Sequence, residues 1–319
     1  MAEAGTAGVL ATMLLLVPHT LPLRRVNPAA AGAVWFAALV LRALLVLALA
    51  LAALLVLPAT AWFDRVAGWS VHGLGSLHLD LSGEAVAHVA VLAPPVLTAL
   101  SVLGFAAGVL RGGVALEREL SRRSLGSGPG GSLVIADRAL LVAVPGLGRR
   151  RIVLSDRALA ELDAAELEAC LAHESGHLSR CHRALGLAGD CLATLARPVP
   201  GARKARSGLL LSLERDADEY AVARTGNPLA LASAICKVAG ARRGLDGLAA
   251  FGLDGAATSA RLDCLLADGR RRGSAPLEGL VLAAAVLLFA VAAAGAAALV
   301  LWLGDSAPRA ALAAALSCG

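Results

Sequence analysis

The sequence predicts a mainly α-helical membrane protein with about four transmembrane helices and one α+β domain outside the lipid. The first observation is composition, because 58% of the 319 residues are hydrophobic and only 3% are aromatic. The mean hydropathy of +0.72 is far above that of a soluble globular domain. The second observation is that apolar residues form long stretches, several of which could cross a hydrocarbon core of about 30 Å. The third is a central segment in which charged residues, turn signals and amphipathic patterns alternate.

Four apolar stretches are expected to cross the membrane, at about residues 7–23, 31–57, 86–110 and 277–303. The first is shorter than the others and is interrupted by Pro18 and Pro22. Because it also lacks a basic region before it, we interpret it as a short span rather than a cleaved signal peptide. The predicted organisation is a membrane region over 1–110, a domain over 111–276, a fourth helix over 277–303 and a short tail over 304–319.

Arginine placement predicts the orientation of these spans. Arg24 and Arg25 follow the first span, and the third span is followed by four arginines between residues 111 and 123. The loop 58–85, between the second and third spans, instead holds three acidic residues and one arginine. Short cytoplasmic loops carry the Lys/Arg excess in multi-pass membrane proteins. We therefore expect the central domain to be cytoplasmic in the cell membrane, with loop 58–85 and the tail outside.

The positive charges of the chain are expected to face the lipid bilayer. Cytoplasmic arginines near anionic headgroups explain the net charge of +5, and no stripe of basic and aromatic residues indicates a direct nucleic-acid partner. Arg42 is the one charged residue inside the second apolar stretch. A charge at this depth can mark function. Because Arg42 lies near the cytoplasmic end of the stretch, we favour a side chain that extends to the interface.

The pentapeptide His173-Glu174-Ser175-Gly176-His177 lies in an Ala/Leu-rich helical pattern, which follows a capping-box signal at Asp163 and Glu166. Residues four apart lie on one face of a helix, so His173 and His177 could share one metal ion. Glu174, about 100° round the helix, could reach a water on that ion. This pattern is typical of a zinc peptidase, and Glu174 is the candidate catalytic base.

A catalytic zinc site needs a third protein ligand and an open position. Glu214 and Asp218 are again four apart on a predicted helix, so we expect Glu214 to complete the metal site and Asp218 to orient a histidine from outside it. The alternative is an ordinary solvated acidic face. Cys181 continues the ligand face of the first helix, but on one straight helix it would lie too far along the axis. Tyr220 and His182 are candidate donors to the oxyanion of the reaction.

The stretch before the first motif predicts a small sheet. Residues 124–132 read as a Gly/Ser-rich linker, and β-like runs follow at 133–135, 139–144 and 151–154. Such a sheet beside a zinc helix could bind substrate as an added strand. A purely structural hairpin fits the same sequence.

These motifs resemble those of the BlaR/MecR-type membrane-integral peptidases, the β-lactam sensor-transducers. The resemblance rests on residues 152–182, on the run from Glu214 to Val222 and, more loosely, on the spans and the run 261–266. It implies a zincin-like (gluzincin) fold, Zn²⁺ held by His173, His177 and Glu214, and antirepressor activity. We expect the chain to lack the penicillin-binding sensor of that family, since only 16 residues follow the last predicted span and Ser-x-x-Lys does not occur in the sequence. Heat-shock and CAAX-type membrane peptidases share both motifs.

The sequence therefore predicts a membrane-embedded zinc metalloendopeptidase. Its expected substrate is a cytoplasmic protein, by the resemblance a winged-helix transcriptional repressor cut during signal transduction. Two alternatives stay open. One is a protease of the heat-shock or CAAX type in protein quality control. The other is a non-proteolytic signalling protein with a structural zinc, which would leave Glu174 without a role.

Overall fold

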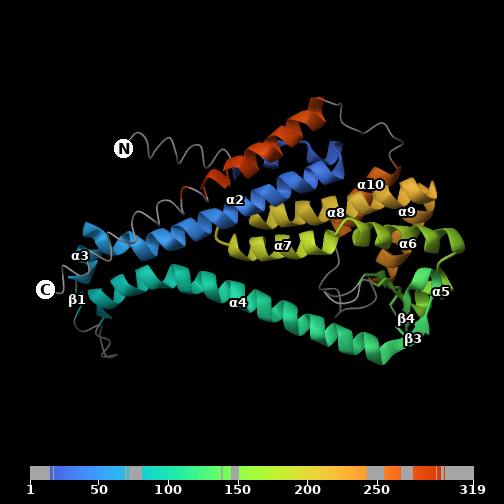
Figure 1. Ribbon diagram of the computed structural model, residues 1–319, viewed down its shortest axis with the longest axis horizontal. Helices are drawn as coiled ribbons and strands as arrows, with labels where there is room; N and C mark the ends of the chain where they lie inside the picture. The colour runs from blue at the N-terminus through green and yellow to red at the C-terminus, as the bar shows by residue number, and fades with distance from the viewer. Residues whose placement is uncertain are drawn as a thin grey trace.

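The computed structural model describes residues 15–16, 18–68, 70–71, 81–137, 139–144, 151–242, 255–266, 276–291, 293–295 and 298. These residues are mostly helical, with long helices side by side and a small sheet at one end (Figure 1). The α-helices are α2 (Pro28–Leu55), α3 (Ala61–Ala67), α4 (Gly83–Arg123), α5 (Asp156–Glu161), α6 (Ala164–Ser179), α7 (His182–Leu195), α8 (Ala202–Thr225), α9 (Pro228–Arg242) and α10 (Gly255–Leu266). Short 3-10 helices are η1 (Leu23–Arg25), η2 (Leu57–Ala59) and η4 (Pro129–Gly131). The strands are β1 (Ser70–Val71), β2 (Leu81–Ser82), β3 (Ser124–Ser127), β4 (Leu133–Ile135), β5 (Val142–Ala143) and β6 (Val153–Ser155).

Three described helices are long and apolar enough to cross a membrane, namely α2, α4 and the helix Pro276–Gly295. They fall on the second, third and fourth predicted spans. Most of the first predicted span, at 7–23, and the end of the last one, after residue 298, lie outside the described residues. The sequence sets the start of α2 clearly, because the Asn27 side chain accepts a hydrogen bond from the Ala29 N–H and Pro28 occupies the first turn.

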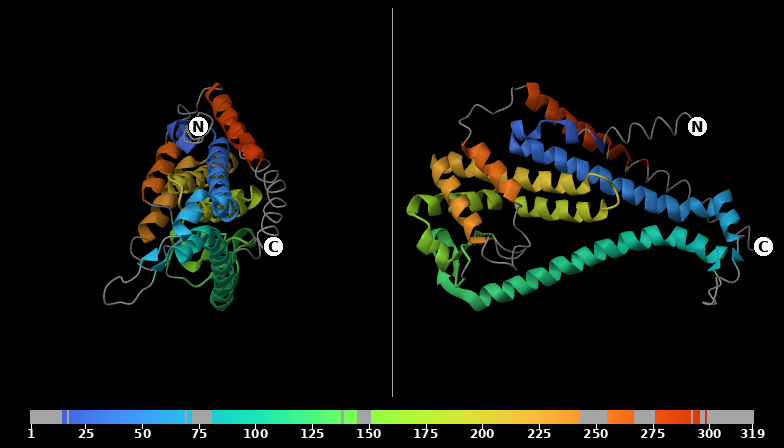
Figure 2. Two further views of the ribbon diagram at one scale, coloured as in Figure 1. Left: turned by 90° about the vertical axis from the view of Figure 1, so that its left-hand side faces the viewer. Right: turned by 180° about the vertical axis from the view of Figure 1, so that it is seen from behind.

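Helices α2 and α4 run in opposite directions, and α3 and the β1–β2 hairpin join them at the end far from the larger sheet (Figures 1 and 2). The loop predicted to lie outside and the segment predicted to lie in the cytoplasm are therefore at opposite ends of these two helices. With 41 residues, α4 is roughly 60 Å long, about twice the thickness of a hydrocarbon core. The predicted domain boundary at 110/111 thus falls inside α4, which continues as a single helix to Arg123.

The larger sheet has the strand order β3-β4-β6-β5. Strand β4 pairs in parallel with β6, whereas β3 and β5 pair antiparallel with their neighbours. Two sequence interpretations are corrected here. The Gly/Ser-rich stretch after α4 is not only a linker, because Ser124–Ser127 forms β3. The runs at 133–135 and 139–144 do not form a hairpin, since β6 inserts between β4 and β5 and accepts pairing from both sides.

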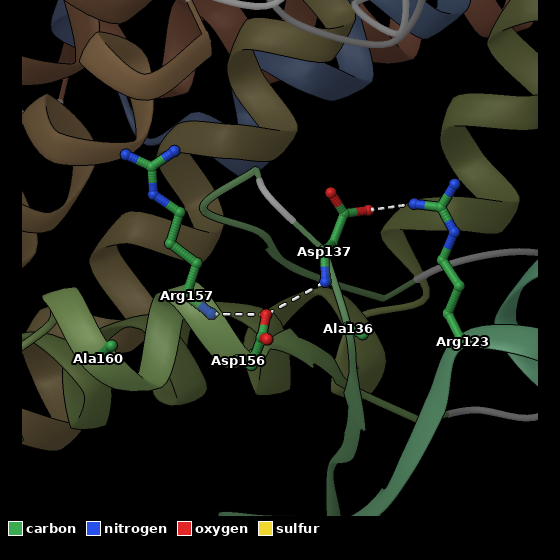
Figure 3. A pocket seen from close by; sticks show the side chains of 6 residues that line it. All are labelled: Arg123, Ala136, Asp137, Asp156, Arg157 and Ala160. Atoms are coloured by element: carbon green, nitrogen blue, oxygen red, sulfur yellow. Dashed lines mark hydrogen bonds and ion pairs between the residues drawn. The ribbon is translucent and has the colours of Figure 1, made fainter.

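The junction of α4 with the sheet borders an open cleft of about 690 Å³, lined by Arg123, Ala136, Asp137, Asp156, Arg157 and Ala160 (Figure 3). Arg123 pairs with Asp137 at 2.9 Å. The Asp137 main-chain N–H donates to Asp156 Oδ1 over 3.1 Å. These contacts tie the end of the long helix to the start of α5, so the apolar span and the sheet are joined by side chains as well as by the chain itself.

The largest core lies where α7, α8 and the helix Pro276–Gly295 pack against the first half of α2. Fully buried Val34 and Leu39 of α2 meet Leu209 of α8 there. The Trp35 ring of α2 packs directly on α8 at Gly208, where an added Cβ would lie only 2.4 Å from Cε2 of that ring. The paired helices α7 and α8 are thus fused to α2 and do not form a separate lobe.

The environment of Arg42 differs from the sequence prediction. Its side chain does not extend into solvent but is covered by protein, because the residue is only 1% exposed. The guanidinium donates to the main-chain oxygens of Ala38, Leu15 and Pro200 at 2.9, 2.6 and 3.1 Å. Pro200 belongs to the loop between α7 and α8. The arginine therefore fastens the tip of that helical pair to the middle of α2.

Candidate metal centre

Helix α6 carries the first motif, and its local sequence explains where the helix begins. The predicted capping box is confirmed, since Asp163 accepts from the Glu166 N–H and the Glu166 side chain accepts from the Asp163 N–H. Glu166 is buried and also holds α9 against α6, through Ser233 at 2.6 Å and Lys237 at 2.5 Å. Burial raises the pKa of Glu166, but the hydrogen bonds from Lys237 and Ser233 outweigh it and lower the pKa overall. The helix that carries the two candidate ligands is thus fastened at its beginning.

His173, His177 and Glu214 come together as the sequence predicted, although they lie on two helices far apart in the chain. Helix α8 runs antiparallel to α6 and α7 (Figure 1). The two Nε2 atoms are 3.1 Å apart, and the Glu214 carboxylate lies 3.6 Å from His173 Nε2 and 3.5 Å from His177 Nε2. All three ligand atoms lie within 4.8 Å of one another.

These separations fit a tetrahedral zinc ion. Ligands at about 2.0–2.1 Å from zinc with tetrahedral angles are roughly 3.3 Å apart, close to the distances in the site. Two imidazoles and one carboxylate are also a donor set typical of catalytic zinc, which keeps its fourth position for water or substrate. The residues present therefore fit the ion that the motif implies.

The charges of the site are strongly coupled. Burial disfavours a charged His173, yet the carboxylates of Asp218 and Glu214 outweigh it and raise its pKa to about 10. For His177, burial lowers the pKa to about 4, because the opposing effect of the Glu214 carboxylate is smaller than the cost of desolvation. Although burial alone would raise it, the pKa of Glu214 is held well below its ordinary value by His173 and Arg261. A metal cation would replace the proton that these groups share.

Glu174 lies beside the ligands and next to the edge of the sheet. Its surroundings raise its pKa to about 7, chiefly through desolvation, and its carboxylate accepts a hydrogen bond from the Val144 N–H. Val144 directly follows β5, and its carbonyl oxygen accepts from Arg183 of α7. The candidate base is therefore fixed between the candidate metal ligands and the strand that ends the sheet. A carboxyl group with a pKa near neutrality can both take up and release a proton.

Arg261 is a site residue that the sequence analysis missed. It lies on α10, and its guanidinium contacts both acidic residues of the second motif: Nη1 is 2.8 Å from Glu214, while Nη2 and Nε are 2.7 and 2.8 Å from Asp218. Its side chain is only 12% exposed. Burial alone would lower its pKa, but the two carboxylates raise it. Two acids four residues apart on one helix face favour a cationic neighbour, and this is the signal that could have indicated an arginine.

Asp218 lies beside His173, the first candidate ligand. Its Oδ1 is 2.9 Å from His173 Nδ1. The carboxylate lies off the ring's N–H direction, so the contact is electrostatic rather than a well-aligned hydrogen bond. Asp218 thus holds His173 mainly by charge, and Arg261 fixes the carboxylate from the other side.

The two candidate oxyanion donors have different environments. His182 is 4% exposed, and both of its ring nitrogens are engaged, one with His177 and the other with Asp216. This arrangement leaves neither nitrogen to face a substrate oxygen, which argues against His182 as a donor. The Tyr220 ring packs on Gly176, where an added Cβ would lie 3.1 Å from Cδ1, and Arg180 lies 5.4 Å from its centroid. A donor role for the Tyr220 hydroxyl stays a prediction.

The comparisons with known proteins bear on this same region. Residues 143–200 match the model of Peptidase family M48. The match indicates a metallopeptidase and supports the zincin-like interpretation. It covers β6, α5, α6 and α7, with both histidines of the first motif, and ends before Glu214 on α8. No curated protein and no solved structure matches the chain. The M48 match therefore supports the class of enzyme, while the BlaR/MecR branch stays a prediction.

Proposed function

We propose that the protein is a membrane-embedded zinc metalloendopeptidase that hydrolyses peptide bonds of a cytoplasmic protein. The observation that carries the proposal is the convergence of His173 Nε2, His177 Nε2 and the Glu214 carboxylate, with Glu174 beside them. A purely structural zinc site would have no use for Glu174, a carboxyl group whose pKa is raised to about 7. The M48 match over 143–200 supports the same class of reaction.

The residues of the site have separate roles in this proposal. Zinc, when held by the three ligands, supplies the Lewis acidity that polarises a scissile carbonyl and lowers the pKa of water. Glu174 takes a proton from the attacking water and passes it to the leaving amine. Asp218 and Arg261 keep His173 and Glu214 in place, so that little reorganisation is needed during the reaction.

Strand β5 is the proposed binding edge for substrate. It ends the sheet, with β6 as its partner among the described strands, and the residue after it bonds to Glu174. An extended peptide that pairs with the outer edge of β5 would bring its backbone next to the base and the ligands. Main-chain pairing supplies affinity without demanding a particular sequence. Selectivity therefore depends on which proteins can bring an extended segment to the edge of β5, as well as on side-chain contacts.

The substrate is proposed to lie on the cytoplasmic side. The arginines that follow the first and third spans support this placement, and α3 with the β1–β2 hairpin lies at the far end of α2 and α4. By the resemblance to antirepressor peptidases, we infer a transcriptional repressor as the physiological substrate. Comparing the proteomes of cells with wild-type protein and with Glu174→Gln tests this inference. One stabilised repressor supports it, whereas many accumulated membrane-protein fragments would favour quality control instead.

Casein cleavage by the purified full-length protein tests the chemistry. Wild type is expected to cleave casein, to lose activity in a chelator and to regain it with zinc. Glu174→Gln should abolish cleavage while the protein stays folded. Glu168→Gln is the matched control, because Glu168 is an exposed glutamate on the same helix and should keep full activity. Cleavage by Glu174→Gln at the wild-type rate would contradict the proposed role of the base.

A further inference from the structure

The helix that carries the zinc motif is broken just beyond it. Helix α6 ends at Ser179, and Cys181 has a φ of 55° and a ψ of 31°, in the left-handed region. It is the one non-glycine residue with positive φ among the described residues. This conformation costs a residue other than glycine roughly 1–2 kcal/mol, so the surrounding structure must favour it. Helix α7 then begins directly at His182.

The break places His182 against the second metal-binding histidine. In a continuous helix, a residue five positions after His177 would point about 140° away from it. In the structure, His182 Nδ1 lies 3.0 Å from His177 Nδ1, and the two ring centroids are 5.0 Å apart. His182 itself is buried. The left-handed turn at Cys181 therefore brings His182, which a continuous helix would point away from the site, into contact with His177.

A carboxylate from α8 completes this arrangement. Asp216 Oδ2 lies 2.9 Å from His182 Nε2. Its other oxygen accepts from Arg180 at 2.5 Å, and Arg180 also donates to the Asp216 main-chain oxygen at 3.2 Å. Asp216 is two residues from both Glu214 and Asp218, so its side chain leaves α8 in a different direction. The second motif thus directs Asp218 to His173 and Asp216 to the neighbour of His177.

The contacts of the two rings are compatible with one set of neutral tautomers. With Nε2 of His177 turned to the other ligands, its proton lies on Nδ1 and is donated to His182 Nδ1. The remaining proton of His182 then lies on Nε2 and is donated to Asp216. The negative charge of Asp216, which Arg180 pairs with, favours donation in this direction, from His177 to His182 and from His182 to Asp216. The Nδ1 atom of His177 thereby has a hydrogen-bond partner in a second histidine, His182. The Nδ1 atom of His173 instead lies directly beside the Asp218 carboxylate, but without a well-aligned hydrogen bond.

We propose that Arg180, Asp216 and His182 form a relay that positions His177 for metal binding by fixing its tautomer and ring orientation. The inference rests on the proposed zinc function. Partners of this kind raise metal affinity because the ligand does not have to be ordered or reprotonated when the ion binds. His182 and Asp216 are positioning residues in this account, since neither touches the reacting atoms.

Zinc affinity, measured on the full-length protein in detergent by competition with a chromophoric chelator, tests the proposal. His182→Leu removes the acceptor for His177 and should weaken zinc binding about 10–100-fold. His182→Gln keeps an acceptor oxygen and a donor amide on one side chain, and it should recover most of the loss. Asp216→Asn keeps the shape of its side chain but removes the charge, and its affinity should fall between those of wild type and His182→Leu.

Two controls separate positioning from a general structural role. Asp190→Asn breaks a different ion pair between α7 and α8, to Arg206 at 2.5 Å, and should leave zinc affinity unchanged. In a double-mutant cycle, Asp216→Asn should cost much less affinity in the His182→Leu background than in wild type, because the relay is already broken there.

The relay and the zinc function fail in different ways. Wild-type protein without zinc affinity would overturn the proposed function. Wild-type zinc binding together with unchanged affinity in both His182→Leu and Asp216→Asn would overturn the relay alone. Equal losses in His182→Leu and His182→Gln would also overturn it, because a side chain that only fills space would give that result. Thermal unfolding of each variant in chelator reports the structural contribution separately.

Discussion

Arg261→Gln should destabilise the metal-free protein strongly. The change removes a cation that makes three contacts of 2.7–2.8 Å to Glu214 and Asp218. It leaves behind two carboxylates whose side chains are only 25% and 5% exposed. His173 can pair with only part of this charge. The excess negative charge is then buried without a counter-ion, which is the costly case for an ion pair in a protein interior.

The expected loss is about 3–5 kcal/mol in the free energy of unfolding, the usual cost of removing one partner from a buried pair. Three charge-assisted hydrogen bonds at about 1.5–3 kcal/mol each would give a larger sum, but Asp218 can take up a proton in the variant and limit the cost. For a domain of this size the loss corresponds to a fall in Tm of roughly 10 °C. Zinc should reduce the loss, since the ion neutralises Glu214.

The pH dependence has a definite sign. Burial would raise the pKa of Asp218, but Arg261 and His173 outweigh it and lower the folded-state pKa below its ordinary value. A lowered carboxyl pKa stabilises the fold above the unfolded pKa of about 3.9, and this contribution disappears as the pH falls through the folded pKa. The difference in Tm between wild type and Arg261→Gln should therefore be full at neutral pH and shrink in acid.

Thermal unfolding in detergent with excess chelator measures this difference, and Arg261→Lys serves as the comparison. Lysine keeps the charge but loses the planar fork, so its Tm should lie between those of the other two proteins. Equal Tm values for wild type and Arg261→Gln without metal would refute the reasoning. They would mean that the acids are neutralised by other means.

Three further predictions concern packing and topology. Gly208→Ala should cost about 1–3 kcal/mol through overpacking against Trp35, as measured by thermal unfolding, whereas Gly112→Ala, with nothing within 4 Å of its added Cβ, should cost nothing. Glu166→Gln should lower the free energy of unfolding by about 1–2 kcal/mol at neutral pH, since the remaining Lys237 is 41% exposed and can turn to solvent. The loss should fade in acid because the pKa of Glu166 is lowered in the fold. In a cysteine-free background, a membrane-impermeant thiol reagent should label Asp64→Cys in intact cells and Ser207→Cys only after lysis, and the reverse pattern would place the site outside.

The parts of the fold that were predictable are those coded locally. The capping box at Asp163, the spacing of His173 and His177 and the pair Glu214 and Asp218 all follow from helical periodicity, and each lies on a helix. The three described apolar helices follow from composition and length. In each case the signal lies within a few turns of one element, so that no knowledge of the tertiary packing was needed.

The parts that were missed depend on contacts between distant segments. Arg42 was expected at the lipid interface, because the sequence does not indicate that the α7–α8 loop brings the Pro200 carbonyl to it. Arg261 reaches the site from a helix more than 40 residues beyond Glu214. The left-handed turn at Cys181 was equally hidden, since cysteine carries no signal for positive φ. The order of the short strands β3 to β6 was also missed, because the local sequence pattern does not specify which strands pair with each other.

Zinc content of the purified protein tests the central claim most directly. Wild type and Glu174→Gln should each hold one zinc ion per chain, because Glu174 is a base and not a ligand. His173→Ala, His177→Ala and Glu214→Ala should each lose the ion while the protein stays folded in detergent. A full zinc content in Glu214→Ala would contradict the account, because the site would then lack its third ligand on α8.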